Sequence, residues 1–279
     1  MHTKAVLVLL VICALSGAEG RTATQLMDTL MNSYKSYVMP DIPINVTMQM
    51  SLLAINSLDI LNGLANLEVY MRLWWQDDRL TWNPSTYEGI EEMQFLTDVV
   101  YKTNLIWVPE IFCARCLSDT LSATKAVANY TGGVYWRRHG VVSVGLPFAL
   151  DDYPYDKQTL EMSFFGWSMP INYMNLSTNG DFDYSHTIKN IQWDIVGAET
   201  IDTTRNYINQ TFGVVEYHVH FKRVPTTLEK GVIVPGIAIA FLALLYIFMK
   251  KESGLRLTYL TTILLNVVLF LQMMTGFMP

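Results

Sequence analysis

Two long uncharged stretches lie near the C-terminus of the chain. From Gly231 to Met249 no charged residue occurs, and a helix that rises roughly 1.5 Å per residue over this length would cross most of a bilayer core of about 30 Å. A second uncharged stretch runs from Leu257 to Pro279, after a short basic connection over 250–256. The pattern predicts transmembrane helices at about 231–249 and 257–277, with the connection on the cytoplasmic side.

The N-terminal stretch has the pattern of a secretory signal. His2 and Lys4 precede an apolar run from Ala5 to Leu15, and small residues follow from Ser16 onward. The run is too short to span a bilayer, so a membrane anchor is the weaker interpretation. We therefore expect residues 1–20 to be a signal peptide that is absent from the mature protein.

Four sequons for N-linked glycosylation agree with a secreted N-terminal region. All of them precede the long uncharged stretches, as expected if the chain up to about residue 229 is extracellular. The asparagines of these sequons are Asn45, Asn129, Asn175 and Asn209.

Between the two ends, the polar and apolar positions predict one helix followed by many strands. Gln25 to Tyr37 has apolar residues at helical spacing. Later segments are rich in β-branched and aromatic residues and are separated by Asn, Asp, Gly and Pro. These segments are 46–53, 67–75, 133–144, 160–167, 191–196 and 214–221. Short strands at such regular intervals predict an immunoglobulin-like β-sandwich.

The expected fold class is therefore a mainly β extracellular domain, with an N-terminal helix, followed by α-helical transmembrane segments. We expect the signal peptide over 1–20, an extracellular domain over 21–229 and the transmembrane region over 230–279. No flexible linker separates the last two, so the sandwich is expected to lead almost directly into the first membrane helix.

The second membrane stretch carries its polar residues on one side. At about 100° per residue, one half of the helical wheel holds Thr258, Thr261, Thr262, Asn266, Gln272 and Thr275. Leu265 and Leu269 lie in the middle of this polar face. In a ring of identical helices the face would line a pore, with Thr258, Thr262 and Gln272 around a constriction formed by the two leucines. A helix whose polar face packs against a partner, without a water path, is the alternative.

Composition narrows the classes of function. The 279-residue chain is 51% hydrophobic and 16% charged, which is too apolar for a disordered chain or an ordinary soluble enzyme. A formal net charge of -6 gives no support to nucleic-acid binding. No nucleophile elbow, phosphate loop or paired-carboxylate motif occurs, so we expect no enzyme and no cofactor.

The cysteines and histidines indicate at most a structural disulfide, and no metal site. Cys113 and Cys116 are close enough in sequence for a small structural disulfide in an oxidising compartment, and two free thiols are the alternative. His218 and His220 alternate on one strand face, but no third ligand is spaced near them. We therefore expect no metal site.

Several motifs occur in order along the chain. They are Trp75-Gln-Asp-Asp-Arg-Leu-Thr-Trp82-Asn-Pro84, Trp107-Val-Pro-Glu110, Leu150-Asp-Asp-Tyr-Pro-Tyr-Asp-Lys-Gln158, Gly166-Trp-Ser168 and the stretch from Glu252 to Pro279. Together they resemble the pentameric ligand-gated ion channels, or Cys-loop receptor superfamily, and more closely its nicotinic acetylcholine receptor branch. The resemblance runs from about residue 25 to the last residue.

The resemblance implies a channel subunit in the plasma membrane, with its N-terminal domain extracellular and a synapse as one candidate setting. It implies a small neurotransmitter-like ligand, an amine or an amino acid, and assembly with other subunits in a homo- or hetero-pentamer within the lipid bilayer. Ligand binding between subunits would open the pore through the signature loop. The coupling residues implied are Tyr153, Pro154, Tyr155 and Asp156.

A ligand pocket between subunits is also implied. Its residues would be Trp167, Tyr207 and Phe212 on one face, and Tyr70, Arg72 and Arg137 on the face of the neighbouring subunit. Aromatic faces hold ammonium groups, each contact being worth roughly 0.5–2 kcal/mol, whereas arginines pair with carboxylates. Without the resemblance, the interpretation would be that Trp167 and Tyr70 are core aromatics and that both arginines are solvated.

The chain departs from the family pattern at several positions. Leu146 and Leu160 stand where cysteines would close the signature loop, so we expect them to pack into the core and the loop to be looser. The hairpin over 203–214 lacks the pair of adjacent cysteines that marks agonist-binding subunits. Ala114 stands where a pocket tyrosine is expected.

Two properties of the pore follow the resemblance only in part. Leu255 and Gly276 occupy positions that are acidic in cation channels, so only the overall resemblance favours cations. Family members have four membrane helices, whereas this sequence ends at Pro279, as either an incomplete chain or a natural truncation. A non-conducting subunit that captures ligand or interferes with assembly, and a membrane-anchored adhesion protein, are the alternatives to a channel subunit.

Overall fold

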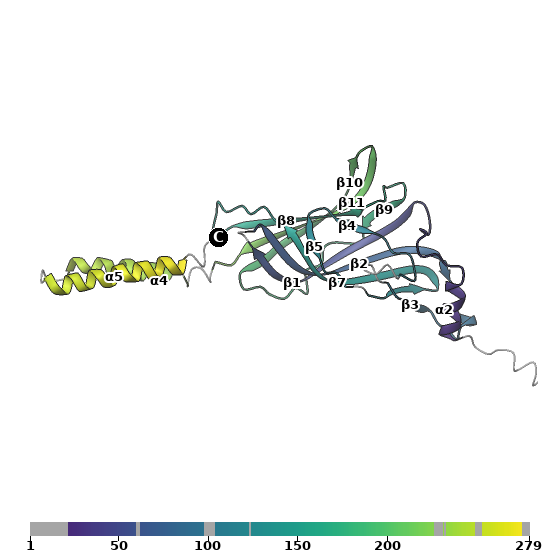
Figure 1. Ribbon diagram of the computed structural model, residues 1–279, viewed down its shortest axis with the longest axis horizontal. Helices are drawn as coiled ribbons and strands as arrows, with labels where there is room; N and C mark the ends of the chain where they lie inside the picture. The colour runs from purple at the N-terminus through teal and green to yellow at the C-terminus, as the bar shows by residue number, and fades with distance from the viewer. Residues whose placement is uncertain are drawn as a thin grey trace, which may run out of the picture.

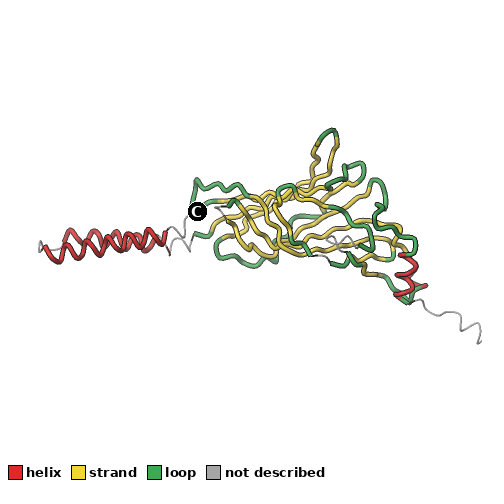
Figure 2. Tube along the Cα trace, viewed as in Figure 1, coloured by secondary structure: helices red, strands yellow, loops and turns green. Residues whose placement is uncertain are grey.

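The chain folds into a two-layer β-sandwich, with a short helix at one end and two longer helices beyond the other end (Figure 1). The computed structural model describes residues 22–59, 62–97, 104–122, 124–225, 231, 233–248 and 253–274. The expected signal peptide over 1–20 lies outside the described residues. Figure 2 shows strands throughout the sandwich, which confirms the prediction of a mainly β fold with flanking helices.

One sheet contains seven strands in the order β3-β6-β7-β2-β1-β9, with β5 paired to β7. Their bounds are β1 Ile44–Asp59, β2 Leu64–Thr81, β3 Glu92–Phe95, β5 Cys116–Asp119, β6 Ala126–Asn129, β7 Thr131–Gly145 and β9 Met174–Thr178. Of these, β1 and β9 run parallel. A short 3-10 helix, η1 (Pro84–Thr86), follows β2.

The other sheet contains four strands in the order β10-β11-β8-β4. Their bounds are β4 Ile111–Cys113, β8 Lys157–Gly166, β10 Trp193–Tyr207 and β11 Gln210–Arg223. The prediction for β10 was too short, because the strand carries mostly exposed polar residues beyond Ile195 and so has no apolar alternation there. The missed strands β3, β4, β5, β6 and β9 are three to five residues long, too short to give a pattern.

Alternate side chains of each long strand fill the space between the sheets. On β2 the buried residues include Leu67, Val69, Met71, Leu73 and Trp75, and on β11 they include Val215, Tyr217, Val219 and Phe221. The residues between them therefore point away from the core. This alternation places Tyr70 and Arg72 on the outward face of one sheet and Glu216 and His218 on that of the other.

The N-terminal helix, α2 (Ala23–Met31), packs Leu26 and Leu30 into the core. Thr22 caps its first turn in a capping box with Gln25, which satisfies two backbone donors. The sequence predicted a helix to Tyr37, but α2 ends at Met31. Beyond the helix, the side chain of Tyr34 takes part in a buried network of hydrogen bonds.

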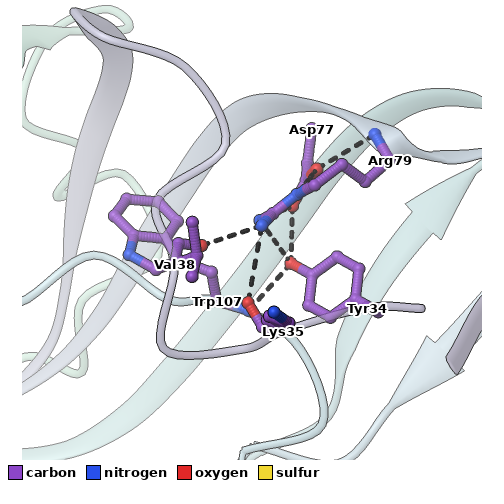
Figure 3. Close-up of polar contacts among 6 residues, drawn as sticks. All are labelled: Tyr34, Lys35, Val38, Asp77, Arg79 and Trp107. Atoms are coloured by element: carbon purple, nitrogen blue, oxygen red, sulfur yellow. Dashed lines mark hydrogen bonds and ion pairs between the residues drawn. The ribbon is translucent and has the colours of Figure 1, made fainter. Parts of the chain in front are cut away.

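Figure 3 shows this network, in which Tyr34 joins the segment after α2 to β2. Its hydroxyl donates to Oδ2 of Asp77 at 2.6 Å, and accepts from Nη2 of Arg79 at 2.9 Å and from the backbone N–H of Trp107 at 3.0 Å. Arg79 also donates to the carbonyl of Val38 at 2.8 Å. Burial, together with Asp77, raises the pKa of Tyr34, so the phenol stays protonated and able to donate.

The signature loop lacks its disulfide, yet both leucines at the cysteine positions are buried. Leu146 is 2% exposed and Leu160 is 0% exposed, as the sequence predicted. Gln158 holds the loop by donating to the carbonyl of Ala149 at 2.7 Å and accepting from its N–H at 3.1 Å. Hydrogen bonds between Gln158 and Ala149 therefore hold this loop together, whereas the family pattern uses a disulfide.

A buried ion pair attaches the same loop to the end of β11. Nε and Nη2 of Arg223 donate to the two carboxylate oxygens of Asp156 at 2.6 and 3.0 Å. The guanidinium also lies over the ring of Trp193, 4.2 Å from its centroid. Burial opposes ionisation, but hydrogen bonds from Arg223 and Gln158 keep the pKa of Asp156 below its usual value.

The C-terminal helices form an antiparallel hairpin. They are α4 (Val234–Leu245), which continues as the 3-10 helix η3 (Tyr246–Phe248), and α5 (Ser253–Met274). The hydroxyl of Tyr259 donates to the carbonyl of Leu242 at 2.6 Å, across the hairpin. Residues 253–256, expected in the connection, are already helical, so α5 begins earlier than the predicted start at Leu257.

Among the described residues, one helix is long and apolar enough to cross a membrane. This is the part of α5 from Gly254 to Gln272, with a mean hydropathy of 1.7. The apolar helix Val234–Phe248 is shorter. Residues 232 and 249 of the predicted first span, and residues 275–277 of the second, lie outside the described residues.

Tyr34→Phe is expected to lower the free energy of unfolding by about 1–3 kcal/mol, because the N–H of Trp107 loses its acceptor and Asp77 loses a donor. Denaturant unfolding of the purified full chain in detergent, followed by tryptophan fluorescence, measures the change. Tyr37→Phe is the matched control, since the side chain of Tyr37 is 81% exposed. Equal stability of the two variants would contradict the structural role of the network.

Arg223→Gln is expected to lower the free energy of unfolding at neutral pH by about 3–5 kcal/mol, because it leaves the buried carboxylate of Asp156 uncompensated. In the wild type, the contribution of Asp156 is complete above its unfolded pKa of about 3.9 and is lost as the pH falls through its lower folded value. The gap between wild type and variant should therefore narrow on acidification, as protonation removes the charge.

Unfolding curves between pH 3 and pH 8 test this dependence. Arg115→Gln is the control, because Arg115 and Glu161 form an exposed pair whose side chains are 44% and 39% exposed. Its loss is expected to cost less than about 1 kcal/mol. A gap for Arg223→Gln that stays constant with pH would contradict the assignment to Asp156.

Candidate functional site

Five aromatic rings gather on the outward face of the four-stranded sheet, and two of them belong to the β10–β11 hairpin. We call this group the aromatic cluster; its members are Phe112, Phe165, Trp167, Tyr207 and Phe212. Ring centroids lie 4.5 Å apart for Phe112 and Trp167, and 5.5 Å apart for Phe112 and Phe165. Phe165, Tyr207 and Phe212 form a triangle with centroid distances of 5.9 to 6.2 Å.

Strand pairing explains why these rings meet. Phe165 on β8 lies in register with Phe112 on β4 and with Val214 on β11. Trp167 follows the end of β8, and its backbone N–H donates to the carbonyl of Glu110 at 3.3 Å. The side chain of Trp167 is 62% exposed, so the interpretation of this residue as a core aromatic is wrong.

Sequence reasoning named three members of the aromatic cluster and missed Phe112 and Phe165. Ala114 carries no ring at the position where the family pattern has one, but Phe112, two residues earlier, places a ring beside Trp167. Neither phenylalanine lies in a recognisable motif. Only the register of β4 with β8 identifies them, because that pairing brings both to the outward face.

The segment that carries Phe112 is held by a disulfide. Cys113 and Cys116 are bonded to each other across a short turn. The turn joins β4 of one sheet to β5 of the other, and the N–H of Ala114 donates to the carbonyl of Ser163 at 2.9 Å. The bond therefore fixes the chain where it crosses between the sheets, next to the aromatic cluster.

Tyr70, Arg72 and Arg137 lie together on the outward face of the seven-stranded sheet. Arg72 on β2 and Arg137 on β7 are in register as direct cross-strand neighbours. Nη1 of Arg72 donates to the hydroxyl of Ser51 at 2.6 Å, and the guanidinium of Arg137 lies 5.6 Å from the centroid of Tyr70. We call these three residues the arginine face.

The arginine face carries a concentrated positive charge. Within the described part of the chain, neither Arg72 nor Arg137 forms an ion pair with a carboxylate. The carboxylate of Glu68 is instead paired with His139, at 2.8 Å. Guanidinium groups without an acidic partner are able to pair with a carboxylate.

The aromatic cluster and the arginine face lie on opposite sides of the same sandwich. The two sheets pack against each other (Figure 1). The burial pattern places these two candidate half-sites on the outward faces. One chain therefore does not bring Trp167 and Tyr70 together. A second subunit is needed to place an arginine face opposite an aromatic cluster.

The signature-loop residues lie at the end of the sandwich where the chain leaves for α4. Asp156 is 1% exposed and bound to Arg223, the last residue of β11. Tyr153 lies under the same guanidinium, with its ring centroid 5.1 Å away, whereas Tyr155 is 53% exposed. Arg223 therefore connects the end of β11 directly to the signature loop.

The five predicted pore residues on α5 lie on one exposed side of the helix. They are Thr258, Thr262, Leu265, Leu269 and Gln272. Asn266 is less exposed, on the side where Tyr259 contacts α4. The hydroxyls of Thr258 and Thr262 donate to the carbonyls of Gly254 and Thr258, four residues back, at 3.1 and 2.9 Å, so the helix itself satisfies them.

The predicted glycosylation sites differ in their surroundings. Asn209 lies in the exposed turn between β10 and β11. Asn45 and Asn175 are in register on parallel strands, and Nδ2 of Asn175 donates to Oδ1 of Asn45 at 3.3 Å. Oδ1 of Asn129 accepts from the N–H of Gly133 at 2.8 Å, within a turn.

The described residues contain no group of three or more potential metal ligands. Nε2 of His218 lies 3.6 Å from a carboxylate oxygen of Glu216, and Nε2 of His220 lies 3.8 Å from one of Glu199. Each histidine is thus placed beside a carboxylate on the outward face of the four-stranded sheet.

Comparison with known proteins identifies the family of the chain. The family described as "Neurotransmitter-gated ion-channel ligand binding domain" matches residues 23–225. The neuronal acetylcholine receptor subunit alpha-9-I of Oncorhynchus mykiss is 26% identical over 274 residues, which cover 95% of this chain and 47% of that protein.

Two further relatives give the same result. The neuronal acetylcholine receptor subunit alpha-6 of Rattus norvegicus is 24% identical over 264 residues, covering 91% of this chain and 52% of that protein. The alpha-9 subunit of Gallus gallus is 25% identical over 276 residues, covering 95% and 56%. The chain spans about half the length of these relatives. By its sandwich, its signature loop and the match over residues 23–225, the chain belongs to the neurotransmitter-gated ion-channel family, the Cys-loop receptor superfamily, and is similar to its nicotinic acetylcholine receptor subunits.

Proposed function

We propose that this chain is a subunit of an extracellular ligand-gated ion channel in the plasma membrane. Its ligand binds between subunits, with the aromatic cluster of one subunit facing the arginine face of the next. The observation that carries this proposal is the placement of two complementary half-sites on opposite outward faces of one sandwich. A ring of subunits would bring such faces together at every interface.

The chemistry of the two half-sites supports a small ligand with an ammonium group. Exposed rings such as Trp167 and Tyr207 offer π faces to a cation, and the relatives are named as acetylcholine receptor subunits. Arg72 and Arg137 favour a ligand that also carries a carboxylate, as an amino acid does, because their charges have no described acidic partner.

The proposed gating path runs from the hairpin through β11 to the membrane. Residues 21–229 form the extracellular domain and residues 230–279 the membrane region. Ligand binding at the aromatic cluster biases the position of β11, whose last residue, Arg223, holds Asp156 of the signature loop. The pore is lined by the side of α5 that carries Leu265 and Leu269.

Choline and betaine test the ligand class, because they share a trimethylammonium group and only betaine carries a carboxylate. Trp167→Ala is expected to weaken binding of both at least about tenfold, through loss of an aromatic face and its packing. Arg72→Gln is expected to weaken betaine alone, by about tenfold. Isothermal titration of the full chain purified in detergent measures the affinities.

Two variants outside the half-sites are controls for this experiment. Tyr130→Ala removes an aromatic side chain that is 42% exposed, and Arg115→Gln removes a guanidinium from an exposed ion pair. Both are expected to bind choline and betaine as the wild type does. Unchanged binding in Trp167→Ala, with the fold intact by circular dichroism, would contradict the proposed site.

Leu265→Thr tests, in receptors that carry an ion current, whether Leu265 lies at the constriction of the pore. A polar side chain at the proposed constriction favours a water-filled open pore, so the agonist concentration for half-maximal current should fall about tenfold. Leu264→Thr is the matched control, because Leu264 lies about 100° around the helix from Leu265. Equal current responses for the two variants would show that Leu265 does not form the constriction.

A further inference from the structure

An ion pair lies at the edge of the aromatic cluster. Nη2 of Arg205 on β10 contacts Oε1 of Glu216 on β11, and the side chains are 37% and 13% exposed. Glu216 is therefore a carboxylate that is largely shielded from water. Its other oxygen lies 3.6 Å from Nε2 of His218, farther than a hydrogen bond.

Arg205 also contacts the aromatic cluster itself. It lies in register with Phe212, and its side chain interacts with that of Tyr207. The interaction with Tyr207, together with the charge of Glu216, raises the pKa of Arg205, although burial opposes the shift. The guanidinium is thus a permanent positive charge beside two of the rings.

Aromatic faces beside a shielded carboxylate are what an organic cation requires. Here the protein supplies both, but the carboxylate of Glu216 is already paired with the guanidinium of Arg205. The negative charge beside the aromatic cluster is therefore balanced before any ligand arrives. A ligand cation gains the full attraction of Glu216 only if Arg205 withdraws.

We propose that Arg205 is a resident cation of the ligand site, which neutralises Glu216 and weakens the capture of organic ammonium ions by the aromatic cluster. This proposal rests on the proposed function and adds a specificity-determining pair to the same site. A ligand with only an ammonium group competes directly with Arg205 for Glu216. A ligand that also carries a carboxylate gains a second contact at the arginine face, which offsets this competition.

Choline titrated against the purified full chain tests the proposal. Arg205→Gln is expected to bind choline about tenfold more tightly than the wild type, because Glu216 is released to pair with the ammonium. Glu216→Gln is expected to weaken binding, and the double variant Arg205→Gln/Glu216→Gln to lose the gain. Arg205→Lys keeps the charge, so it should bind choline as the wild type does.

The uncharged isostere 3,3-dimethylbutan-1-ol separates the proposal from a purely structural role of the pair. It has the shape of choline without the charge, so its affinity should not change in Arg205→Gln. A loosened hairpin would instead change the binding of both molecules. Arg115→Gln is the matched control, since it breaks another ion pair, between the turn after β4 and Glu161 on β8.

Choline affinity that is unchanged or lower in Arg205→Gln, or an equal gain for the isostere, would overturn the proposal. Failure of choline to bind either the wild type or Arg205→Gln would overturn it as well. The proposed function fails separately, when neither choline nor betaine responds to Trp167→Ala.

Discussion

The burial of alternate side chains between two sheets is the constraint on which the rest of this structure depends. A strand with its odd-numbered residues in the core must show its even-numbered residues to the outside. Leu73 and Trp75 are buried, so Arg72 faces outward; Tyr217 is buried, so Glu216 faces outward. Each sheet therefore carries one half of the proposed ligand site, and a single chain does not bring the two halves together.

The same sandwich is closed at its ends by buried polar groups. At one end Tyr34 and Arg79 surround the buried carboxylate of Asp77, and at the other Arg223 holds Asp156. A buried charge that loses its partner is costly, so each network fixes the loop that it contacts. In the signature loop, this ion pair and the hydrogen bonds of Gln158 hold a loop that has no disulfide. The looser loop expected from the missing cysteines is thus anchored by other means.

Most of the long strands were predictable, because a half-buried strand alternates apolar and polar residues and β1, β2, β7, β8 and β11 do so. The predicted end of α2 was wrong, because Tyr34 has the right spacing for a helix but its hydroxyl binds Asp77, a residue 43 positions away. For the candidate site, motifs pointed to Trp167, Tyr207 and Phe212. Phe112 and Phe165 belong to no motif, and only strand register brings them to the cluster.

The sequence by itself determined the family, the sandwich and the apolar helices, because periodicity and ordered motifs are local properties of the chain. It also determined which residue types were available for an ammonium or a carboxylate. Only the tertiary structure decided which of them meet: Arg72 beside Arg137, and Arg205 between Tyr207 and Glu216. The first contact joins strands that are far apart in sequence, and the second depends on the register of the two strands of a hairpin. Register is set by the packing of the whole core rather than by any segment alone.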